Sequence, residues 1–423
     1  MVRAYLLRVV DDELDRLTLP AVIVEGAKAV GKTSTLERRS KSVHRLFRTA
    51  ELELLQADQH RVLAGDRPIF IDEFQRYPQA VDVVREAVDA DQSPRQFYLA
   101  GSAGADADTH SGAGRIVTVR MRPMAFSERQ LEQPTVSLAG LLGGGRPPVE
   151  GETQVGLNGY VDEILRSGFP AIRNYAGADL HAALRGYVDR VVQRDIPDEL
   201  GRAVRRPDAL RRWLRAYAAA SGTATTIERI RDSAHGGEGR TPARTTTEAY
   251  RDALERLWIV DDLPAWLPTK NHLAPLLQTP KRFLADPALA ASLVGAGRAK
   301  LVSGEDVEPA VPRDGSFLGA LFEALVVLSV RVYAQAAGAT VAHFRERHGR
   351  HEVDIIVERP DGGVVALEVK LSQTVAREEV KHLIWLREQL GDQLLDSAVV
   401  CVSPFAYRRK DGVAVVPLAL LGP

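Results

Sequence analysis

The residues best suited to chemistry form the stretch Gly26-Ala27-Lys28-Ala29-Val30-Gly31-Lys32-Thr33, which Ser34 follows. It comes directly after the apolar run 21–24 and opens a segment with helical character. The glycines let the backbone turn its N–H groups around a phosphate, and the helix directs its positive end there. Lys32 would reach the β- and γ-phosphates, and the Thr33 hydroxyl would help to hold Mg²⁺. The stretch matches the P-loop pattern GxxxxGK[ST]; the alternative is a chance match in a chain rich in glycine and alanine.

Two carboxylates follow a second apolar run at a place that suits the same chemistry. Residues 68–71 form this run, and Asp72 and Glu73 come at its end. A P-loop protein that hydrolyses a nucleotide uses one acid here for the Mg²⁺ shell and a second one to orient the attacking water. We assign the metal role to Asp72 and the catalytic role to Glu73. A buried strand with a solvated acidic end is the alternative.

Further polar groups come from the next two predicted strands. The apolar run 96–100 leads to Ser102, which would lie beside the P-loop and face the γ-phosphate. The alternating stretch that starts at residue 114 predicts another strand. It carries Arg115 and Arg120, which are available to meet phosphate charge in this chain or in a neighbouring one. Solvated surface arginines are the alternative for both.

Composition excludes several classes of protein. The chain has 423 residues, enough for two or three domains, and its net charge of −1 gives no overall attraction to nucleic acid. Cys401 is the single cysteine, which rules out an internal disulfide and a cysteine-built metal site, so a reducing cytoplasm is the expected location. The first residues lack the pattern of a signal peptide, and no apolar run approaches the ~20 residues that span a membrane. No membrane partner is therefore expected.

The pattern of apolar residues predicts an α/β protein with four regions. Strands and helices alternate up to about residue 130, which is typical of a largely parallel sheet. The predicted regions are a P-loop domain at 1–132, a linker and helical region at 133–204, a winged helix-turn-helix-like domain at 205–300 and a C-terminal α/β domain at 301–423.

The winged-helix prediction rests on helices at 208–220, 226–234 and 245–257 and on an apolar strand pair within 258–266. In that fold the third helix enters the major groove of DNA. Arginines on or before this helix would meet phosphates or base edges, but carboxylates alternate with them. These residues are Arg240, Arg244, Arg251, Glu248, Asp252 and Glu255. A small helical connector without DNA contact is the alternative.

One carboxylate stands alone in the apolar helix predicted at 317–328. An isolated buried carboxylate costs several kcal/mol or shifts its pKa, so Glu323 needs a cation, a metal ion or a hydrogen-bond partner. Two predicted strands, 352–357 and 364–370, follow as a hairpin with its turn at 360–363.

This hairpin gathers three charged groups on one face. A three-residue turn would set Asp354 opposite Lys370, with Glu368 two residues away on the same face. Asp354 and Glu368 could hold Mg²⁺ through oxygen ligands, and Lys370 could stabilise negative charge on a phosphate. With Glu323 they form a candidate catalytic site for metal-assisted phosphodiester hydrolysis. A solvated, salt-bridged hairpin face is the alternative.

Together these motifs resemble the prokaryotic AAA-type ATPases of the AAA_14/DUF4143 group over nearly the whole chain. The resemblance rests on the P-loop, Ile71-Asp72-Glu73-Phe74, Gly101-Ser102, the segment 114–128, Gly168-Phe169-Pro170, Arg194-Asp195-Ile196 and the 352–370 hairpin. It implies ATP as the nucleotide, together with Mg²⁺. The C-terminal part is similar to the PD-(D/E)XK nuclease-like fold, whose active residues map onto Glu323, Asp354, Glu368 and Lys370.

Three hypotheses for function follow. The first is an ATP-dependent enzyme that acts on double-stranded DNA, in which the P-loop ATPase drives or gates a winged helix and a metal-dependent nuclease-like domain. The second is a nucleotide-switched DNA-binding or regulatory protein, in which the nuclease fold is only a scaffold. The third is ATP-driven remodelling of a protein partner. A homo-oligomer is compatible with each of them.

Overall fold

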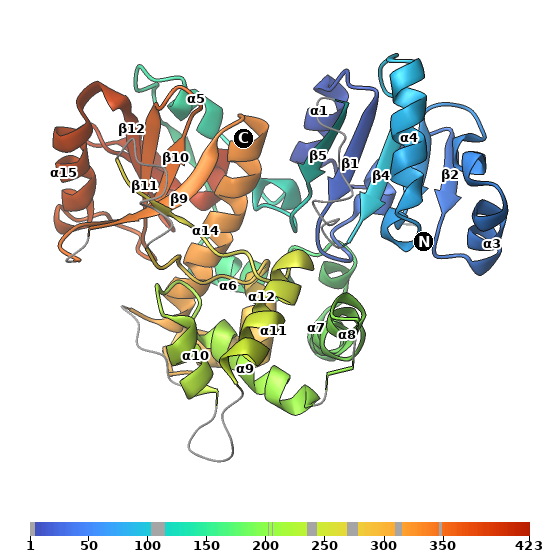
Figure 1. Cartoon of the computed structure of the whole chain (residues 1–423). Coiled ribbons are helices and arrows are strands. Elements are labelled where there is room, and N and C mark those ends of the chain that lie inside the picture. Colours follow the sequence, from blue (N-terminus) through green and yellow to red (C-terminus); the bar gives the residue numbers. More distant parts are fainter. Residues whose placement is uncertain are drawn as a thin grey trace.

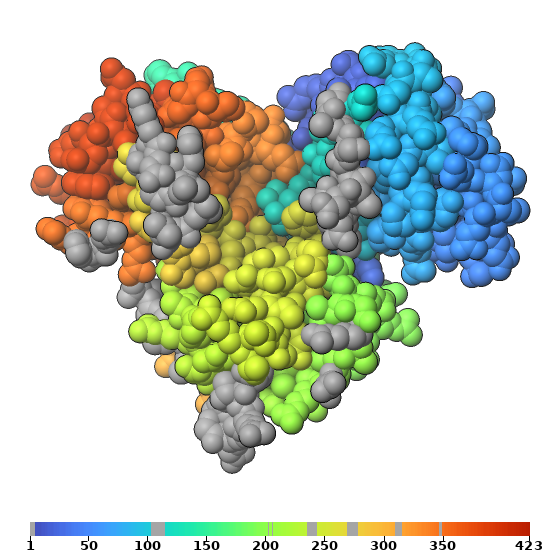
Figure 2. Space-filling view, in the orientation of Figure 1, coloured from blue at the N-terminus to red at the C-terminus, as the bar shows by residue number. Residues whose placement is uncertain are grey.

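The computed structural model describes residues 5–102, 115–201, 203–204, 206–234, 243–268, 278–308, 315–346 and 349–423, which form three regions (Figure 1). An α/β domain at the N-terminus (blue) and an α/β domain at the C-terminus (orange and red) are joined by a helical region (green and yellow). Figure 2 shows the two α/β domains as separate lobes above the helical region. Arg240, predicted to contact DNA, lies outside the described residues.

The N-terminal domain is built on a parallel sheet, with strand order β2-β3-β4-β1-β5. The strands are β1 (Ala21–Glu25), β2 (Ser42–Arg45), β3 (Ile69–Asp72), β4 (Phe97–Gly101) and β5 (Ile116–Arg120). The accompanying helices are α1 (Val9–Arg16), α2 (Lys32–Glu37), α3 (Thr49–Ala57) and α4 (Gln79–Ala90). Along β1, Val22 and Val24 enter one core and Ala21 and Ile23 the other, because successive strand residues face opposite sides. The predicted parallel sheet is confirmed.

The chain after the N-terminal domain first runs along the C-terminal one. β6 (Val136–Ser137) pairs with β15 (Leu421–Gly422), and β7 (Gly151–Glu152) pairs with β13 (Phe405–Arg408). Between them, α5 (Leu138–Leu142) packs on the C-terminal sheet. Much of the predicted linker therefore belongs structurally to the C-terminal domain.

The helical region follows. Its helices are α6 (Leu157–Arg166), α7 (Gly177–Arg190), α8 (Ile196–Glu199), α9 (Pro207–Ala219), α10 (Ile227–Ser233), α11 (Arg244–Arg256), α12 (Pro287–Val294) and α13 (Arg298–Ser303). A π-helical turn, Val191–Asp195, joins α7 to α8. The helices α9, α10 and α11 lie close to the bounds that the sequence predicts for the three helices of a winged helix.

The strand pairing after α11 differs from the prediction. Residues 259–263 run antiparallel to residues 281–285 and form a short ribbon with them. The predicted partner, β8 (Ala265–Trp266), instead lies beside β9 (Thr340–Arg345) in the C-terminal sheet. A two-residue hairpin at Asp261-Asp262 would need a positive φ angle at one or both central residues, which favours sequences that contain glycine or asparagine. The longer connection avoids this requirement.

The C-terminal sheet has the order β7-β13-β14-β12-β11-β10-β9-β8. Its remaining strands are β9 (Thr340–Arg345), β10 (Glu352–Glu358), β11 (Val364–Val369), β12 (Leu394–Cys401) and β14 (Ala414–Pro417). α14 (Phe317–Ala336) packs on one face of it and α15 (Lys381–Leu390) on the other. Among the described residues α14 alone is long and apolar enough to cross a membrane, so the prediction that no such run exists is wrong. However, 78% of that stretch is buried inside the protein, as in the core helix of a globular domain.

Candidate functional site

The P-loop and the acidic strand end meet at one edge of the N-terminal sheet. β3, β4 and β1 are parallel neighbours, so their carboxyl ends lie side by side. Gly26 follows β1, Asp72 ends β3 and Ser102 follows β4. The Thr33 hydroxyl lies 3.2 Å from both carboxylate oxygens of Asp72. The structure therefore brings together residues that the sequence predicts to act on one phosphate.

A side chain is excluded at Gly26 by lack of space and disfavoured at Gly31 by the backbone conformation. A Cβ atom on Gly26 would lie 2.1 Å from the carbonyl oxygen of Met121. Gly31 has a φ angle of 110°, in the region that favours glycine. Of the other predicted loop residues, Ala27 and Val30 are buried, whereas Ala29 and Ser34 are exposed.

Lys32 is buried beneath the loop and binds its carbonyl groups. Its ammonium donates to the carbonyl oxygens of Gly26 at 2.7 Å and of Ala27 at 3.0 Å. Burial lowers the pKa of Lys32 to about 8, although the charges of Glu73 and Asp72 oppose this shift. To contact a phosphate, Lys32 would exchange these two hydrogen bonds for charge-assisted ones.

Glu73 follows β3 in a backbone conformation that is rare for residues other than glycine. Its φ and ψ angles are 59° and 44°. The Gln75 side-chain amide donates to the Glu73 carboxylate at 2.6 Å and to the Ser102 hydroxyl at 3.2 Å. This amide orients the predicted catalytic carboxylate towards the end of β4. The sequence does not single out Gln75, although a polar side chain two residues after Glu73 is near enough in the chain to contact the Glu73 carboxylate.

Asp72 and Thr33 supply oxygen atoms of the kind that Mg²⁺ prefers. Burial, followed by the neighbouring Glu73 charge, raises the pKa of Asp72 to about 6. A bound cation would reverse this shift, because it favours the ionised carboxylate. Within the described ranges no group of three or more His, Cys, Asp or Glu side chains could hold a metal ion. Mg²⁺ commonly takes its remaining ligands from phosphates and water, so Asp72 and Thr33 fit an ion that binds together with a nucleotide.

Arg115 lies away from this site. β5 runs parallel to β1, with Ile116 opposite Ala21 at the start of both strands, so Arg115 lies at the opposite edge of the sheet from the P-loop. It forms an ion pair with Asp89 at 2.5 Å. The prediction that Arg115 binds the nucleotide of its own chain is therefore wrong. The direction of the strand places its first residue at the far edge.

Arg120 lies at the correct edge, opposite Glu25, but it has other partners. Its guanidinium lies 3.0 Å from the Asp261 carboxylate and 4.2 Å from the centre of the Trp258 ring. Burial lowers the pKa of Arg120 to about 10, although Asp261 opposes the shift. Arg120 therefore joins the N-terminal domain to the ribbon after α11.

The helical region contacts the P-loop at Lys28. The Lys28 ammonium lies 2.5 Å from the carboxylate of Asp195, a buried residue at the end of the π-helical turn. The Tyr187 hydroxyl on α7 donates to the Lys28 carbonyl oxygen at 3.1 Å. Because 167 residues separate Lys28 from Asp195, the sequence offers no signal for this pair.

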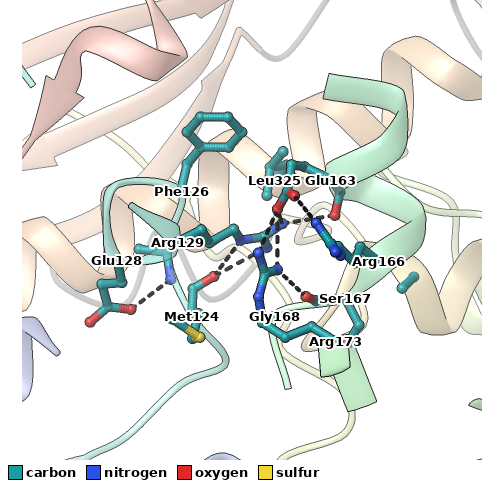
Figure 3. A network of polar contacts seen from close by, with 12 residues as sticks. Met124, Phe126, Glu128, Arg129, Glu163, Arg166, Ser167, Gly168, Arg173 and Leu325 are labelled. Atoms are coloured by element: carbon teal, nitrogen blue, oxygen red, sulfur yellow. Dashed lines mark hydrogen bonds and ion pairs between the residues drawn. The ribbon is translucent and has the colours of Figure 1, made fainter. Parts of the chain in front are cut away.

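A buried polar network joins the segment after β5 to the helical region (Figure 3). The fully buried Arg129 side chain donates to the Glu163 carboxylate at 3.1 Å and to the Met124 carbonyl oxygen at 3.2 Å. Arg173 donates to the same carboxylate at 3.1 Å and to the Ser167 carbonyl oxygen at 2.8 Å. These contacts hold the helical region against the N-terminal domain.

The predicted C-terminal residues also come together, but with another register. The pairing of β10 with β11 sets Asp354 beside Glu368 instead of opposite Lys370, because residues 359–363 form the turn. The difference is two residues, which leaves every side chain on its predicted face. The Lys370 ammonium is therefore still 2.9 Å from Glu368 and 3.9 Å from Asp354.

A lysine that the sequence does not single out lies among these carboxylates. The Lys281 ammonium is 2.8 Å from Asp354, 3.0 Å from Glu323 and 3.0 Å from Glu352, and its side chain is only 4% exposed. Burial raises the pKa of Glu323 to about 7, although the charge of Lys281 opposes the shift. Burial would also raise the pKa of Asp354, but Lys281 and Lys370 outweigh it and hold that pKa well below its usual value.

The predicted Mg²⁺ ligands Asp354 and Glu368 do not fit a metal ion in this arrangement. Lys281 and Lys370 already supply the cations that these carboxylates need. Burial and the charge of Asp354 raise the pKa of Glu368 well above its usual value, although Lys370 opposes the shift. The geometry is that of an ion-pair cluster.

Comparisons with known proteins match three parts of the chain. Residues 19–130 match an AAA domain (AAA_14), residues 157–300 match a domain of unknown function (DUF8612), and residues 318–421 match a domain of unknown function (DUF4143). The predicted resemblance to the AAA_14/DUF4143 group is therefore confirmed over the first and last of these parts. The chain carries a P-loop ATPase domain of this group.

Two proteins and one solved structure are similar to this chain at low sequence identity. The uncharacterized proteins Mb2031c of Mycobacterium bovis and Rv2008c of Mycobacterium tuberculosis are each 25% identical over 410 residues, which covers 94% of this chain and 80% of theirs. Among solved structures, the Walker-type ATPase PABY2304 of Pyrococcus abyssi is 16% identical, with a TM-score of 0.37, and the match covers 67% of this chain and 93% of that one.

Proposed function

We propose that this protein binds and hydrolyses ATP at its P-loop, and that the bound nucleotide switches the contact between the P-loop and the helical region. The observation that carries the proposal is the meeting of the P-loop, Asp72 and Glu73 at one edge of a parallel sheet. In this proposal the C-terminal nuclease-like domain is a scaffold and performs no catalysis.

Each residue at this edge has a separate task in hydrolysis. The loop N–H groups and Lys32 bind the phosphates, and Thr33 and Asp72 hold Mg²⁺, which neutralises phosphate charge when bound. Glu73 accepts a hydrogen bond from the attacking water and orients it towards the γ-phosphate. Gln75, which donates to Glu73 at 2.6 Å, holds this carboxylate in place.

The switching part of the proposal is supported by the contacts of Lys28. Its ammonium and its carbonyl oxygen are both bound by the helical region, through Asp195 and Tyr187. Phosphates in the loop would attract the same ammonium, because Lys28 is one of the loop residues. Nucleotide binding would therefore compete with Asp195 and loosen the hold of the helical region.

The scaffold part is supported by the charges in the C-terminal domain. Lys281 and Lys370 form ion pairs with the carboxylates that a metal-dependent nuclease would use to hold its ion. This arrangement favours the regulatory hypothesis over the hypothesis of a coupled nuclease.

The test is ATP hydrolysis by the wild type, by Glu73→Gln and by Glu86→Gln as a matched control on the exposed face of α4. We expect Glu73→Gln to lower kcat by about 10²–10⁴-fold, the usual range for a general base, without loss of ATP binding. Glu86→Gln should match the wild type. Equal turnover in all three proteins would overturn the catalytic assignment, and the absence of ATP binding in the wild type would overturn the whole proposal.

We further propose that the protein binds double-stranded DNA. A groove of about 460 Å³ between α10, α11 and the ribbon supports this part of the proposal. The groove is lined by Arg231, Arg244, Arg251 and Arg282, together with Glu228 and Glu248 among other residues. Several of these arginines are paired with carboxylates, for example Arg244 with Glu248 at 2.8 Å, so phosphate binding would have to displace them. DNA binding should therefore be strongest at low salt and should change the rate of ATP hydrolysis. Turnover that DNA does not change, with no binding at low salt, would favour a protein partner.

A further inference from the structure

The Lys281 cluster crosses a boundary within the molecule. Lys281 belongs to the ribbon strand 281–285, which pairs with residues 259–263 of the helical region. Its carboxylate partners belong to the C-terminal domain, namely Glu323 on α14 and Glu352 and Asp354 on β10. Three carboxylates of one region therefore share a single ammonium from another region.

The charges explain why this contact is strong. A buried ion needs opposite charges and hydrogen bonds to offset its loss of hydration. The Lys281 ammonium donates hydrogen bonds to Asp354 at 2.8 Å and to Glu323 at 3.0 Å, and the Glu352 carboxylate is a third ion-pair partner at 3.0 Å. Burial alone would lower the pKa of Lys281, but the carboxylates outweigh it and raise that pKa well above its usual value. Lys281 is therefore charged throughout the physiological pH range.

We infer that Lys281 is the resident cation of this acidic cluster: its ammonium takes the place that a divalent ion would otherwise occupy and fastens the ribbon to the C-terminal sheet. The inference does not depend on ATP binding, since it concerns residues remote from the P-loop. It predicts that the wild-type cluster binds no divalent ion and that removal of Lys281 creates a site for one.

An independent observation concerns Glu368. This residue is 3% exposed, and its Oε1 atom has no hydrogen-bond partner among the described residues, while its Oε2 atom accepts from Lys370 at 2.9 Å. The carboxyl groups of Glu368 and Asp354 lie next to each other, and the charge of Asp354 is one cause of the raised pKa of Glu368. If Lys281 were removed, the cations left beside its three carboxylate partners and Glu368 among the described residues would be Lys370 and, 3.6 Å from Glu352, the half-exposed Arg345. Hard cations prefer such oxygen ligands.

The experiment measures binding of Mn²⁺ to the full chain without nucleotide, by electron paramagnetic resonance. The proteins are the wild type, Lys281→Met, Lys281→Met with Asp354→Asn, and Lys410→Met as a control that removes an exposed lysine. We expect Lys281→Met to bind one Mn²⁺ per chain more than the wild type and the control, and we expect Asp354→Asn to abolish this gain. A folded Lys281→Met protein without the gain would overturn the inference.

A second measurement covers the case in which Lys281→Met does not fold, since it leaves several buried carboxylates without their cation. Asp354→Asn in the wild-type background should bind as much Mn²⁺ as the wild type, because Lys281 already excludes the ion. If the wild type bound Mn²⁺ and Asp354→Asn removed it, the cluster would be a metal site and the inference would be wrong. Where Lys281→Met does fold, Mn²⁺ should raise its unfolding temperature and leave that of the wild type unchanged.

Discussion

Replacement of Arg129 by methionine tests whether the buried network of Figure 3 holds the helical region in place. Methionine fills much of the same volume but removes the charge. It leaves the Glu163 carboxylate with Arg173 at 3.1 Å and the more exposed Arg166 at 3.7 Å. It also removes the guanidinium donors that bind the Met124 carbonyl oxygen at 3.2 and 3.1 Å.

The expected magnitude follows from burial. The Arg129 side chain is 0% exposed and that of Glu163 is 2% exposed. Removal of one partner of a buried ion pair costs about 3–5 kcal/mol. Because Arg173 still neutralises Glu163, we expect the lower value, about 3 kcal/mol. Each 1.4 kcal/mol is a factor of ten, so local opening should become on the order of 100-fold more frequent.

Hydrogen–deuterium exchange of the amides at residues 124–129 and 163–173 measures this opening directly, without assuming that so large a chain unfolds in one step. Arg166→Met is the matched control. Arg166 lies 3.7 Å from the same Glu163, but its side chain is 53% exposed, so it should contribute at most ~1 kcal/mol. Similar exchange rates in the two variants would refute the argument that burial decides the strength of these pairs.

Three further predictions concern the P-loop. Gly26→Ala should abolish ATP binding and lower the unfolding temperature, because its Cβ atom would lie 2.1 Å from a main-chain carbonyl oxygen, whereas Gly186→Ala, with open space on α7, should do neither in thermal-shift and binding assays. The affinity for ATP should weaken about tenfold per pH unit above pH 8, because ligand-free Lys32 loses its proton there while phosphates favour its charged form; calorimetry that detected no proton uptake at pH 8.5 would contradict this. Asp195→Asn should tighten ATP binding by up to about tenfold and Lys28→Met should weaken it, since Asp195 competes for the Lys28 ammonium; fluorescence titration with an unchanged Kd in both variants would exclude the switch.

The local sequence pattern was enough to predict which residues meet at the N-terminal site. The P-loop, Asp72, Glu73 and Ser102 were predictable because local apolar runs define strands, and parallel strands bring their carboxyl ends to one edge of the sheet. It also determined which C-terminal residues share a face, since side chains alternate along a strand and a register shift of two residues preserves that alternation.

The pairing of charged groups, in contrast, depends on how distant parts of the chain pack together. Arg115 was misplaced because the direction of β5, and not the residue type, sets the edge at which it lies. Lys28 pairs with Asp195, which is 167 residues away in the chain. Lys281 pairs with Asp354, which is 73 residues away. Electrostatic attraction depends on distance in space and on burial, and neither quantity exists before the chain has folded.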